Sequence, residues 1–338
     1  MELRLKDSQR IGYLDYLRVF AILMIIALHS PLPASDTSSI LLSCISFFNA
    51  SGLTLFFMIS GALLLSKTYD YRTFLKRRFG KVAWPTLFWS LFYLLDNWLQ
   101  GRIGLANLTK SILSIPFGAQ GNGVLWFMYT LMGLYLITPI LSSWLSKASK
   151  KDVETILILW CITLLLPLLG EILPIGGEIG NNHILFYLSG YMGYYILGHY
   201  LERYYQQIRI VCILPLIVIP TMIAIVVKLS GMAVDFYKFF WYLSINIAMM
   251  SAFWFLLAKR IFTFSIPKAI YTISKYSFGI YLVHIFIMRR IVWNWNFVTQ
   301  HGSAFQILTT TILTFVMSYI IVYIISRFPF SKYIIGVK

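Results

Sequence analysis

Long apolar segments separated by short polar stretches dominate the sequence. Ten segments can be delimited, each long enough to cross about 30 Å of hydrocarbon at a rise of about 1.5 Å per residue. Only 12% of the 338 residues are charged, against about 25% in soluble domains. The chain is therefore predicted to be an all-α integral membrane protein with about ten transmembrane helices, and a soluble enzyme is excluded. The segments lie near residues 13–31, 48–66, 82–100, 123–142, 153–171, 183–201, 210–229, 237–258, 277–297 and 304–326.

The distribution of basic residues predicts the topology of these spans. If both termini are cytoplasmic, all but six of the 28 Lys and Arg residues fall on the cytoplasmic side, as the positive-inside rule requires. The same dispersal between apolar runs argues against nucleic-acid binding, in spite of a net charge of +16. The six basic residues on the outer side are Arg102, Lys110, Lys228, Lys238, Arg289 and Arg290.

The connections between the segments are short, and the three cysteines give no disulfide framework and no metal-binding spacing. We therefore expect one membrane-embedded domain over residues 1–338, with no fused soluble domain and no metal. Chemistry must then come from the helices and from the longest connections, which lie near residues 31–47, 66–81, 101–122 and 259–276.

The first span carries two ionisable side chains, which are costly in hydrocarbon and therefore informative. Arg18 and His29 are about three helical turns apart, so they share one helix face but lie about 16 Å apart along its axis. Arg18 is expected near the cytoplasmic boundary and His29 toward the outer half. The ordinary alternative is an interfacial arginine and a histidine at a helix end. No Asp or Glu is expected inside the apolar core, so no carboxylate is predicted to orient His29.

A basic segment at residues 72–81, expected to be a cytoplasmic loop, could serve as a topology signal that touches anionic lipid. Arg and Lys side chains also bind phosphate groups well. The segment is therefore the predicted cofactor-binding site, with Lys76, Arg77, Arg78 and Lys81 as its candidate residues.

Polar residues on other spans are candidates for substrate binding. His284 lies in mid-span, where it needs a partner or a wet cavity. Ser60 precedes Gly61, and the alternative to a functional role is plain helix packing. Trp126 could equally be an ordinary interfacial tryptophan. The outer end of the sixth segment adds Asn182 and His183.

Other polar residues are predicted near the surfaces of the membrane. Carboxylates near the outer surface that could contact a sugar are Asp96, Glu171 and Glu178. The remaining histidines, His199 and His301, fall at span ends, where we expect them to be solvated.

In their order along the chain, these motifs resemble those of the acyltransferase-3 family of bacterial membrane O-acyltransferases. The resemblance runs from Tyr13 to about Phe328. The length, and the expected lack of a fused domain, are most similar to the enterobacterial common-antigen O-acetyltransferase type. The motifs are Arg18 with His29, Phe56 to Gly61, Arg77-Arg78 followed by Pro85, Leu125 to Pro139, and Ser277 to His284.

The resemblance implies transfer of an acyl group from cytosolic acyl-CoA to a hydroxyl of a cell-envelope sugar, at the inner or plasma membrane of a bacterium. Acetyl is the usual group, which makes acetyl-CoA the expected donor, and succinyl is an alternative. Arg18 and His29 match the functional pair of the family. His284 and Ser60 match motif positions to which no role is assigned.

The spacing on the first helix suggests a mechanism. Arg18 and the basic segment would hold the phosphates of acyl-CoA, and the pantetheine arm would run along the helix to bring the thioester to His29. His29 would act as general base or as a transient acyl carrier, since histidine ordinarily titrates near neutral pH.

Two other classes of protein remain open. A transporter of a lipid-linked sugar or small solute would also have many spans with ionisable groups inside them, although no internal symmetry of the kind seen in transporters is found. A structural or assembly protein would not need His29 and His284 inside its spans.

Overall fold

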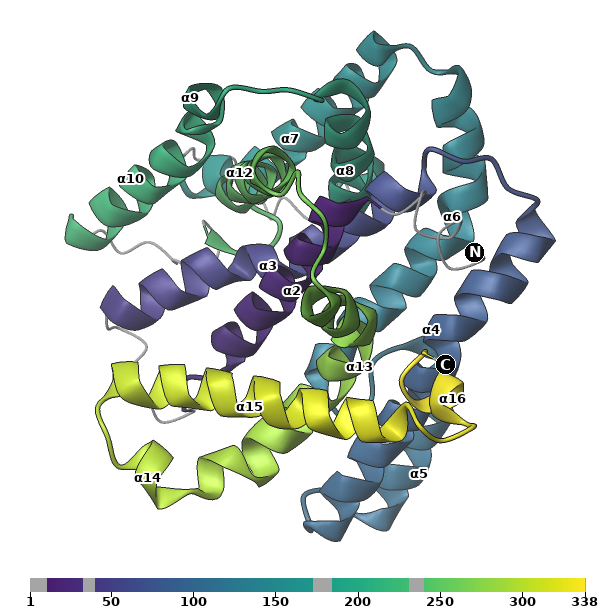
Figure 1. The fold of residues 1–338 in the computed structure, drawn as a ribbon, viewed down its shortest axis with the longest axis vertical. Helices are drawn as coiled ribbons and strands as arrows, with labels where there is room; N and C mark the ends of the chain where they lie inside the picture. Colours follow the sequence, from purple (N-terminus) through teal and green to yellow (C-terminus); the bar gives the residue numbers. More distant parts are fainter. Residues whose placement is uncertain (1–10, 33–39, 173–183, 231–239, 338) are drawn as a thin grey trace. The chain divides into compact units, whose positions relative to one another are not determined.

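The computed structural model describes residues 11–32, 40–172, 184–230 and 240–337, and every regular element in these ranges is a helix (Figure 1). Six helical stretches are long and apolar enough to cross a membrane, and each overlaps one predicted segment. An all-α chain with several membrane-spanning helices is thus confirmed, whereas the total of ten spans and the cytoplasmic termini stay predictions. The six stretches are Gly12–His29, Leu42–Leu64, Gly123–Lys147, Ile210–Leu229, Lys268–Asn294 and Ser303–Ile325.

The surface of helix α10 (Pro215–Leu229) shows why a bilayer is needed. Val218, Met222 and Val226 follow one another along one side of this helix and are each more than half exposed. Water-soluble proteins rarely expose so large a continuous apolar surface. In hydrocarbon the same apolar surface carries no penalty, and a helix makes nearly all of its backbone hydrogen bonds internally.

The described residues form two compact units, and helices α13 (Lys268–Arg290) and α15 (Ser303–Ile325) contribute to both. The first unit comprises the described parts of Met1–Ser66, Ala148–Ser274 and Gly302–Leu308. Besides the starts of α13 and α15, its α-helices are α2 (Gly12–His29), α3 (Ile40–Leu64), α7 (Lys150–Ile172), α8 (Met192–Tyr204), α9 (Ile210–Ile213), α10 and α12 (Ile245–Ile261).

Helices α2, α3, α8 and α12 lie side by side at the centre of the first unit (Figure 1). At one end of this group, Lys259 on α12 forms an ion pair of 2.8 Å with Glu202 on α8 and donates to the carbonyl oxygens of Leu201 and Glu202. Glu202 also accepts a hydrogen bond from the Tyr13 hydroxyl on α2. Lys259 thus satisfies carbonyl groups near the end of α8, where the helix itself provides no donors.

Glycine permits the close crossing of α3 and α8. A Cβ atom on Gly61 would lie 1.8 Å from the carbonyl oxygen of Tyr195, and one on Gly198 would lie 2.0 Å from that of Met58. Two helix backbones therefore touch directly, as in the small-residue interfaces of membrane helices. This packing explains why a glycine is needed at position 61, directly after Ser60.

The second unit comprises Lys67–Lys147, Lys275–His301 and the described part of Thr309–Lys338. The Tyr93 hydroxyl on α4 donates to the carbonyl oxygen of Leu282 on α13 at 2.9 Å, and Phe92 on α4 packs edge-on against Phe286. Besides the remainders of α13 and α15, its α-helices are α4 (Tyr71–Leu99), α5 (Leu105–Ser114), α6 (Trp126–Lys147), α14 (Asn296–Thr299) and α16 (Ser331–Ile334). Short 3-10 turns are η1 (Ile115–Phe117), η2 (Gly123–Leu125) and η4 (Val292–Asn294), while η3 (Phe186–Leu188) belongs to the first unit.

The predicted basic loop at residues 72–81 is wrong, because these residues form the first turns of α4. The Asp70 carboxylate accepts a hydrogen bond of 2.9 Å from the backbone N–H of Thr73, which caps the helix. Lys and Arg are good helix formers, and they favour continuation into the apolar part of α4 in spite of Gly80. The connection at 101–122 likewise contains a helix, α5.

Helices α8 and α12 begin later than the predicted spans that contain them. Helix α8 starts at Met192 rather than near residue 183, since Gly190 adopts φ +90° and its carbonyl oxygen accepts a hydrogen bond from the Trp160 indole. Helix α12 starts at Ile245, after Ser244 caps it by accepting from the backbone N–H of Ile247. Local turn chemistry outweighs the continuous apolar composition at both places.

Candidate functional site

Helix α2 carries both residues of the predicted catalytic pair. Its sequence from Gly12 to His29 is an apolar run with no proline, and the helix ends because Pro31 follows the C-cap residue Ser30. Arg18 has a side chain that is 25% exposed, and His29 is the last helical residue and is half-buried. The helix thus provides the separation of about 16 Å that the pair requires.

A buried carboxylate lies beside Arg18, contrary to the expectation that the core contains no Asp or Glu. Asp15 is fully buried. Its Oδ1 accepts a hydrogen bond of 2.5 Å from the Ser274 hydroxyl on α13 and one of 3.1 Å from the Arg18 guanidinium. A buried carboxylate needs such partners. Asp15 therefore holds Arg18 in a defined orientation.

Replacing Asp15 by alanine is expected to lower the free energy of unfolding by about 1.5–3 kcal/mol, the usual worth of a hydrogen bond to a charged group. Ser274→Ala removes one of the same contacts and should have a smaller effect. Unfolding in detergent, followed by intrinsic fluorescence, measures both. Asp152→Asn, which removes the charge of an exposed carboxylate at the start of α7 but keeps an oxygen that can accept from the backbone N–H of Ser149, is the control. Equal stability of Asp15→Ala and wild type would contradict the assigned contact.

The chain just after His29 is anchored from a second helix. The side-chain amide of Gln306, near the start of α15, donates to the carbonyl oxygen of Ser30 at 3.0 Å, and both residues are buried. The Ser30 hydroxyl donates in turn to the carbonyl oxygen of Ile26 at 2.8 Å. Gln306 therefore fixes the backbone next to His29, and it is well suited to position that side chain.

The predicted phosphate-binding residues lie in the second unit, on the first turns of α4. Lys76, Arg77, Arg78 and Lys81 are all exposed. Exposed cations on a rigid helix keep a fixed spacing, which a loop would not provide. Hydrogen bonds from Thr73 lower the pKa of the capping carboxylate of Asp70, so the cap that starts this helix persists at neutral pH.

The second unit brings His284 near the start of α6. His284 on α13 is fully buried, and its Nδ1 lies 2.6 Å from the carbonyl oxygen of Tyr281. Since a carbonyl oxygen only accepts, Nδ1 carries the proton in this hydrogen bond. The Tyr281 hydroxyl donates to the carbonyl oxygen of Val124, two residues before Trp126. Tyr281 therefore connects two motifs that are far apart in the sequence.

Polar residues at one end of α4 are engaged in structural contacts. Asp96 receives hydrogen bonds from Nε and an Nη of Arg290 on α13, at 3.2 and 2.6 Å. The Asn97 amide donates to the carbonyl oxygen of Gly121 at 2.7 Å, and Gly121 has φ +77°. The ion pair with Arg290 gives Asp96 a structural role that does not require contact with a sugar.

Several predicted site residues lie outside the described part of the chain, namely Asn182, His183, Glu178 and the side chain of Glu171. The prediction that His199 is solvated is wrong. This side chain is 1% exposed, and its Nδ1 lies 3.2 Å from the Ser66 hydroxyl. Its helix, α8, packs closely on α3, which the apolar pattern alone could not predict.

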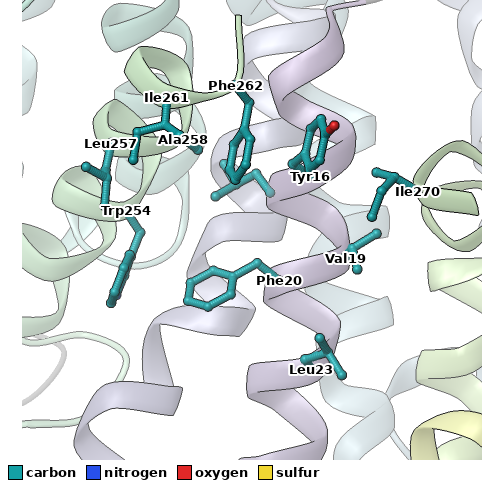
Figure 2. A pocket seen from close by; sticks show the side chains of 11 residues that line it. Tyr16, Val19, Phe20, Leu23, Trp254, Leu257, Ala258, Ile261, Phe262 and Ile270 are labelled. Atoms are coloured by element: carbon teal, nitrogen blue, oxygen red, sulfur yellow. The ribbon is translucent and has the colours of Figure 1, made fainter. Parts of the chain in front are cut away.

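An apolar cavity of about 310 Å³ lies in the first unit between α2 and α12 (Figure 2). The rings of Tyr16 and Phe262 stack face to face at 4.1 Å beside it, and Phe20 and Trp254 form another part of its wall. A binding site for a sugar or a nucleotide needs convergent polar groups. This lining suits hydrocarbon instead, so the cavity is not a candidate for the acceptor sugar.

The family model of the acyltransferase-3 family, an acyltransferase domain, matches residues 11–327. The chain belongs to the acyltransferase-3 family. No curated protein and no solved structure matches it. This acyltransferase is thus a multi-pass membrane enzyme, and the resemblance seen in its motifs is confirmed at the level of the family.

The structure adds three residues to the candidate site around Arg18 and His29 that the sequence did not predict, namely Asp15, Ser274 and Gln306. Asp15 could have been found from its position three residues before Arg18, because residues at that spacing are neighbours on a helix surface. Ser274 and Gln306 gave no comparable signal. Both act through contacts with residues more than 250 positions away in the sequence.

Proposed function

We propose that this chain transfers an acyl group, acetyl in the first instance, from cytosolic acyl-CoA to a hydroxyl group of a bacterial cell-envelope glycan. The narrowest form of the proposal is an acceptor like that of the enterobacterial common-antigen O-acetyltransferase type, and the location is the inner or plasma membrane. Family membership supports acyl transfer. The donor and the acceptor follow from the resemblance of the motifs.

The observation that carries the mechanism is the anchored Arg18 on the same helix as His29. Asp15 and Ser274 hold the arginine at one end of α2, and Gln306 holds the backbone next to the histidine at the other end. Arginine binds phosphate with fixed geometry. A cofactor held by its phosphates near Arg18 would present its thioester about three helical turns away.

In the direct form of the reaction, the His29 imidazole takes the proton of the acceptor hydroxyl as its oxygen attacks the thioester carbonyl carbon. The carbon–sulfur bond then breaks, and the CoA sulfur takes a proton from the imidazolium. The products are the glycan ester and free CoA. In the alternative form, a ring nitrogen of His29 attacks the thioester carbonyl carbon, the carbon–sulfur bond breaks, and CoA leaves as the thiol with the proton lost from the ring. The acceptor hydroxyl then attacks the acyl-imidazole, the nitrogen–acyl bond breaks, and the hydroxyl proton returns to the imidazole.

The proposed donor is tested with acetyl-CoA labelled in its acetyl group and added to the cytoplasmic face of vesicles that contain the purified protein and envelope glycan. Label is expected in the glycan as an ester released by mild alkali. Vesicles without the protein are the control. Label that stays in acetyl-CoA, together with protein-dependent movement of a lipid-linked sugar across the vesicle, would contradict the proposal and favour a transporter.

A further inference from the structure

A second cavity, of about 580 Å³, lies in the second unit where α4 begins and α6 ends. Its volume falls within the range of about 300–1,000 Å³ typical of small-molecule sites. Three aromatic residues line it, Tyr69, Tyr71 and Trp144, together with Lys147. Unlike the apolar cavity between α2 and α12, it combines flat apolar walls with a cation.

The ring of Tyr69, which lines this cavity, is held by packing against the core of the second unit. The ring of Tyr69 packs on Phe74 with 4.6 Å between centroids, and Phe74 packs edge-on against Tyr135 at 6.1 Å. Phe74 is 3% exposed and Tyr135 is 9% exposed, so both belong to the core of this unit. Tyr69 is thus a preformed surface against which a planar group can stack.

Positive charge surrounds the cavity. Lys147 forms part of its lining, and α4, which starts beside it, carries the exposed cations described above. Burial raises the pKa of Tyr69 above its usual value, and the guanidinium of Arg78 offsets this rise in part, so Arg78 is near one of the lining residues. A ligand of this cavity should therefore combine a flat ring with negative charge.

We propose that this cavity binds the adenosine 3′-phosphate end of acyl-CoA. Aromatic side chains stack on purine bases, and Lys and Arg bind phosphate groups. The inference rests on the proposed acyl-CoA-dependent function and adds to it a site for the nucleotide, on the side of the membrane that the charge distribution predicts to be cytoplasmic. The exposed cations of α4 would then face the phosphates, and the pantetheine arm would leave the cavity.

The test compares two acetyl donors. Acetyl-CoA carries the nucleotide, whereas acetyl-4′-phosphopantetheine lacks it. Trp144→Ala is expected to raise the KM for acetyl-CoA about tenfold, the order of effect expected for a lost stacking surface, and to leave the KM for acetyl-4′-phosphopantetheine unchanged. Trp98→Ala is the matched control, since Trp98 lies at the other end of α4 and is 40% exposed against 38% for Trp144.

Two further variants sharpen the comparison. Trp144→Phe keeps a ring and should behave nearly as wild type, which would show that an aromatic ring is the feature required at this position. Lys147→Glu should raise the KM for acetyl-CoA more than the KM for acetyl-4′-phosphopantetheine. A KM for acetyl-CoA that Trp144→Ala leaves unchanged, or a rise that is equal for both donors, would overturn the assignment.

Binding separates this inference from the proposed function. Equilibrium dialysis of labelled adenosine 3′,5′-bisphosphate against the purified protein should show binding that Trp144→Ala weakens about tenfold. If neither donor supports transfer but this binding is found, the proposed function fails and the nucleotide site stands. If transfer occurs and the bisphosphate does not bind, the function stands and the site is overturned.

An anionic lipid headgroup would share part of this chemistry. The kinetic comparison is therefore repeated in vesicles of phosphatidylcholine alone and of phosphatidylcholine with phosphatidylglycerol. The expected defect of Trp144→Ala is the same in both. A defect that is present only with the anionic lipid would assign the cavity to a headgroup and overturn the nucleotide site.

Discussion

Replacing His29 by alanine is expected to lower the rate of acyl transfer from acetyl-CoA by about 10²- to 10⁴-fold, the usual contribution of a general base. The imidazole is the group that would take the proton of the acceptor hydroxyl, and alanine cannot replace it. The effect should fall on kcat. Binding of the donor should persist, because the residues proposed to hold its phosphates are unchanged. Initial rates of labelled ester formation in vesicles measure this effect.

His301→Ala is the matched control, since His301 lies on the surface, just before α15, and full activity is expected there. His29→Gln tests whether hydrogen bonding alone is enough, and it too should be inactive as a base. If wild type without acceptor becomes labelled on His29, the acyl-enzyme form of the mechanism is favoured over direct attack. Full activity of His29→Ala, with Arg18 intact, would show that the proposed mechanism is wrong.

Replacing Gly61 by alanine is expected to destabilise the protein by about 3 kcal/mol or more, the upper range for overpacking. The added methyl carbon would lie 1.8 Å from the backbone carbonyl oxygen of Tyr195. Backbone cannot rotate away as a side chain can, so α3 and α8 must separate. Gly198→Ala meets the carbonyl oxygen of Met58 at 2.0 Å and should behave in the same way. Unfolding in detergent measures both variants.

Gly133→Ala provides the control within helix α6. Nothing lies within 4 Å of a Cβ atom at Gly133, so the substitution is expected to be neutral or to stabilise by about 0.5–1 kcal/mol through higher helix propensity. The contrast between two glycines, both inside helices, isolates the close crossing as the cause. Equal stability of Gly61→Ala and Gly133→Ala would contradict the α3–α8 contact.

The family and the membrane location could be predicted from the sequence because both depend on local patterns. Apolar runs of about 20 residues predict helices in hydrocarbon. The spacing of Arg18 and His29 follows from helical geometry alone, and α2 contains both residues. The resemblance of the motifs was confirmed by the family match over residues 11–327.

Local capping decided features that hydropathy could not. The first turns of α4 are helical because Asp70 accepts from Thr73, although the charge of this segment is typical of a cytoplasmic loop. Ser244 caps the start of α12 in the same manner, whereas the start of α8 follows the positive φ of Gly190, whose carbonyl oxygen accepts from the Trp160 indole. Each of these residues acts through one or two hydrogen bonds. Hydropathy averaged over a window of residues does not detect such local contacts.

The sequence by itself determined that this protein is a helical membrane acyltransferase and that an arginine and a histidine share its first helix. Only the tertiary structure decided what surrounds them. Asp15 is buried because Ser274, far away in the sequence, donates to it, and Gln306 reaches the backbone next to His29 in the same way. Helical periodicity acts within a few residues, whereas burial of a polar group depends on which distant helix packs against it.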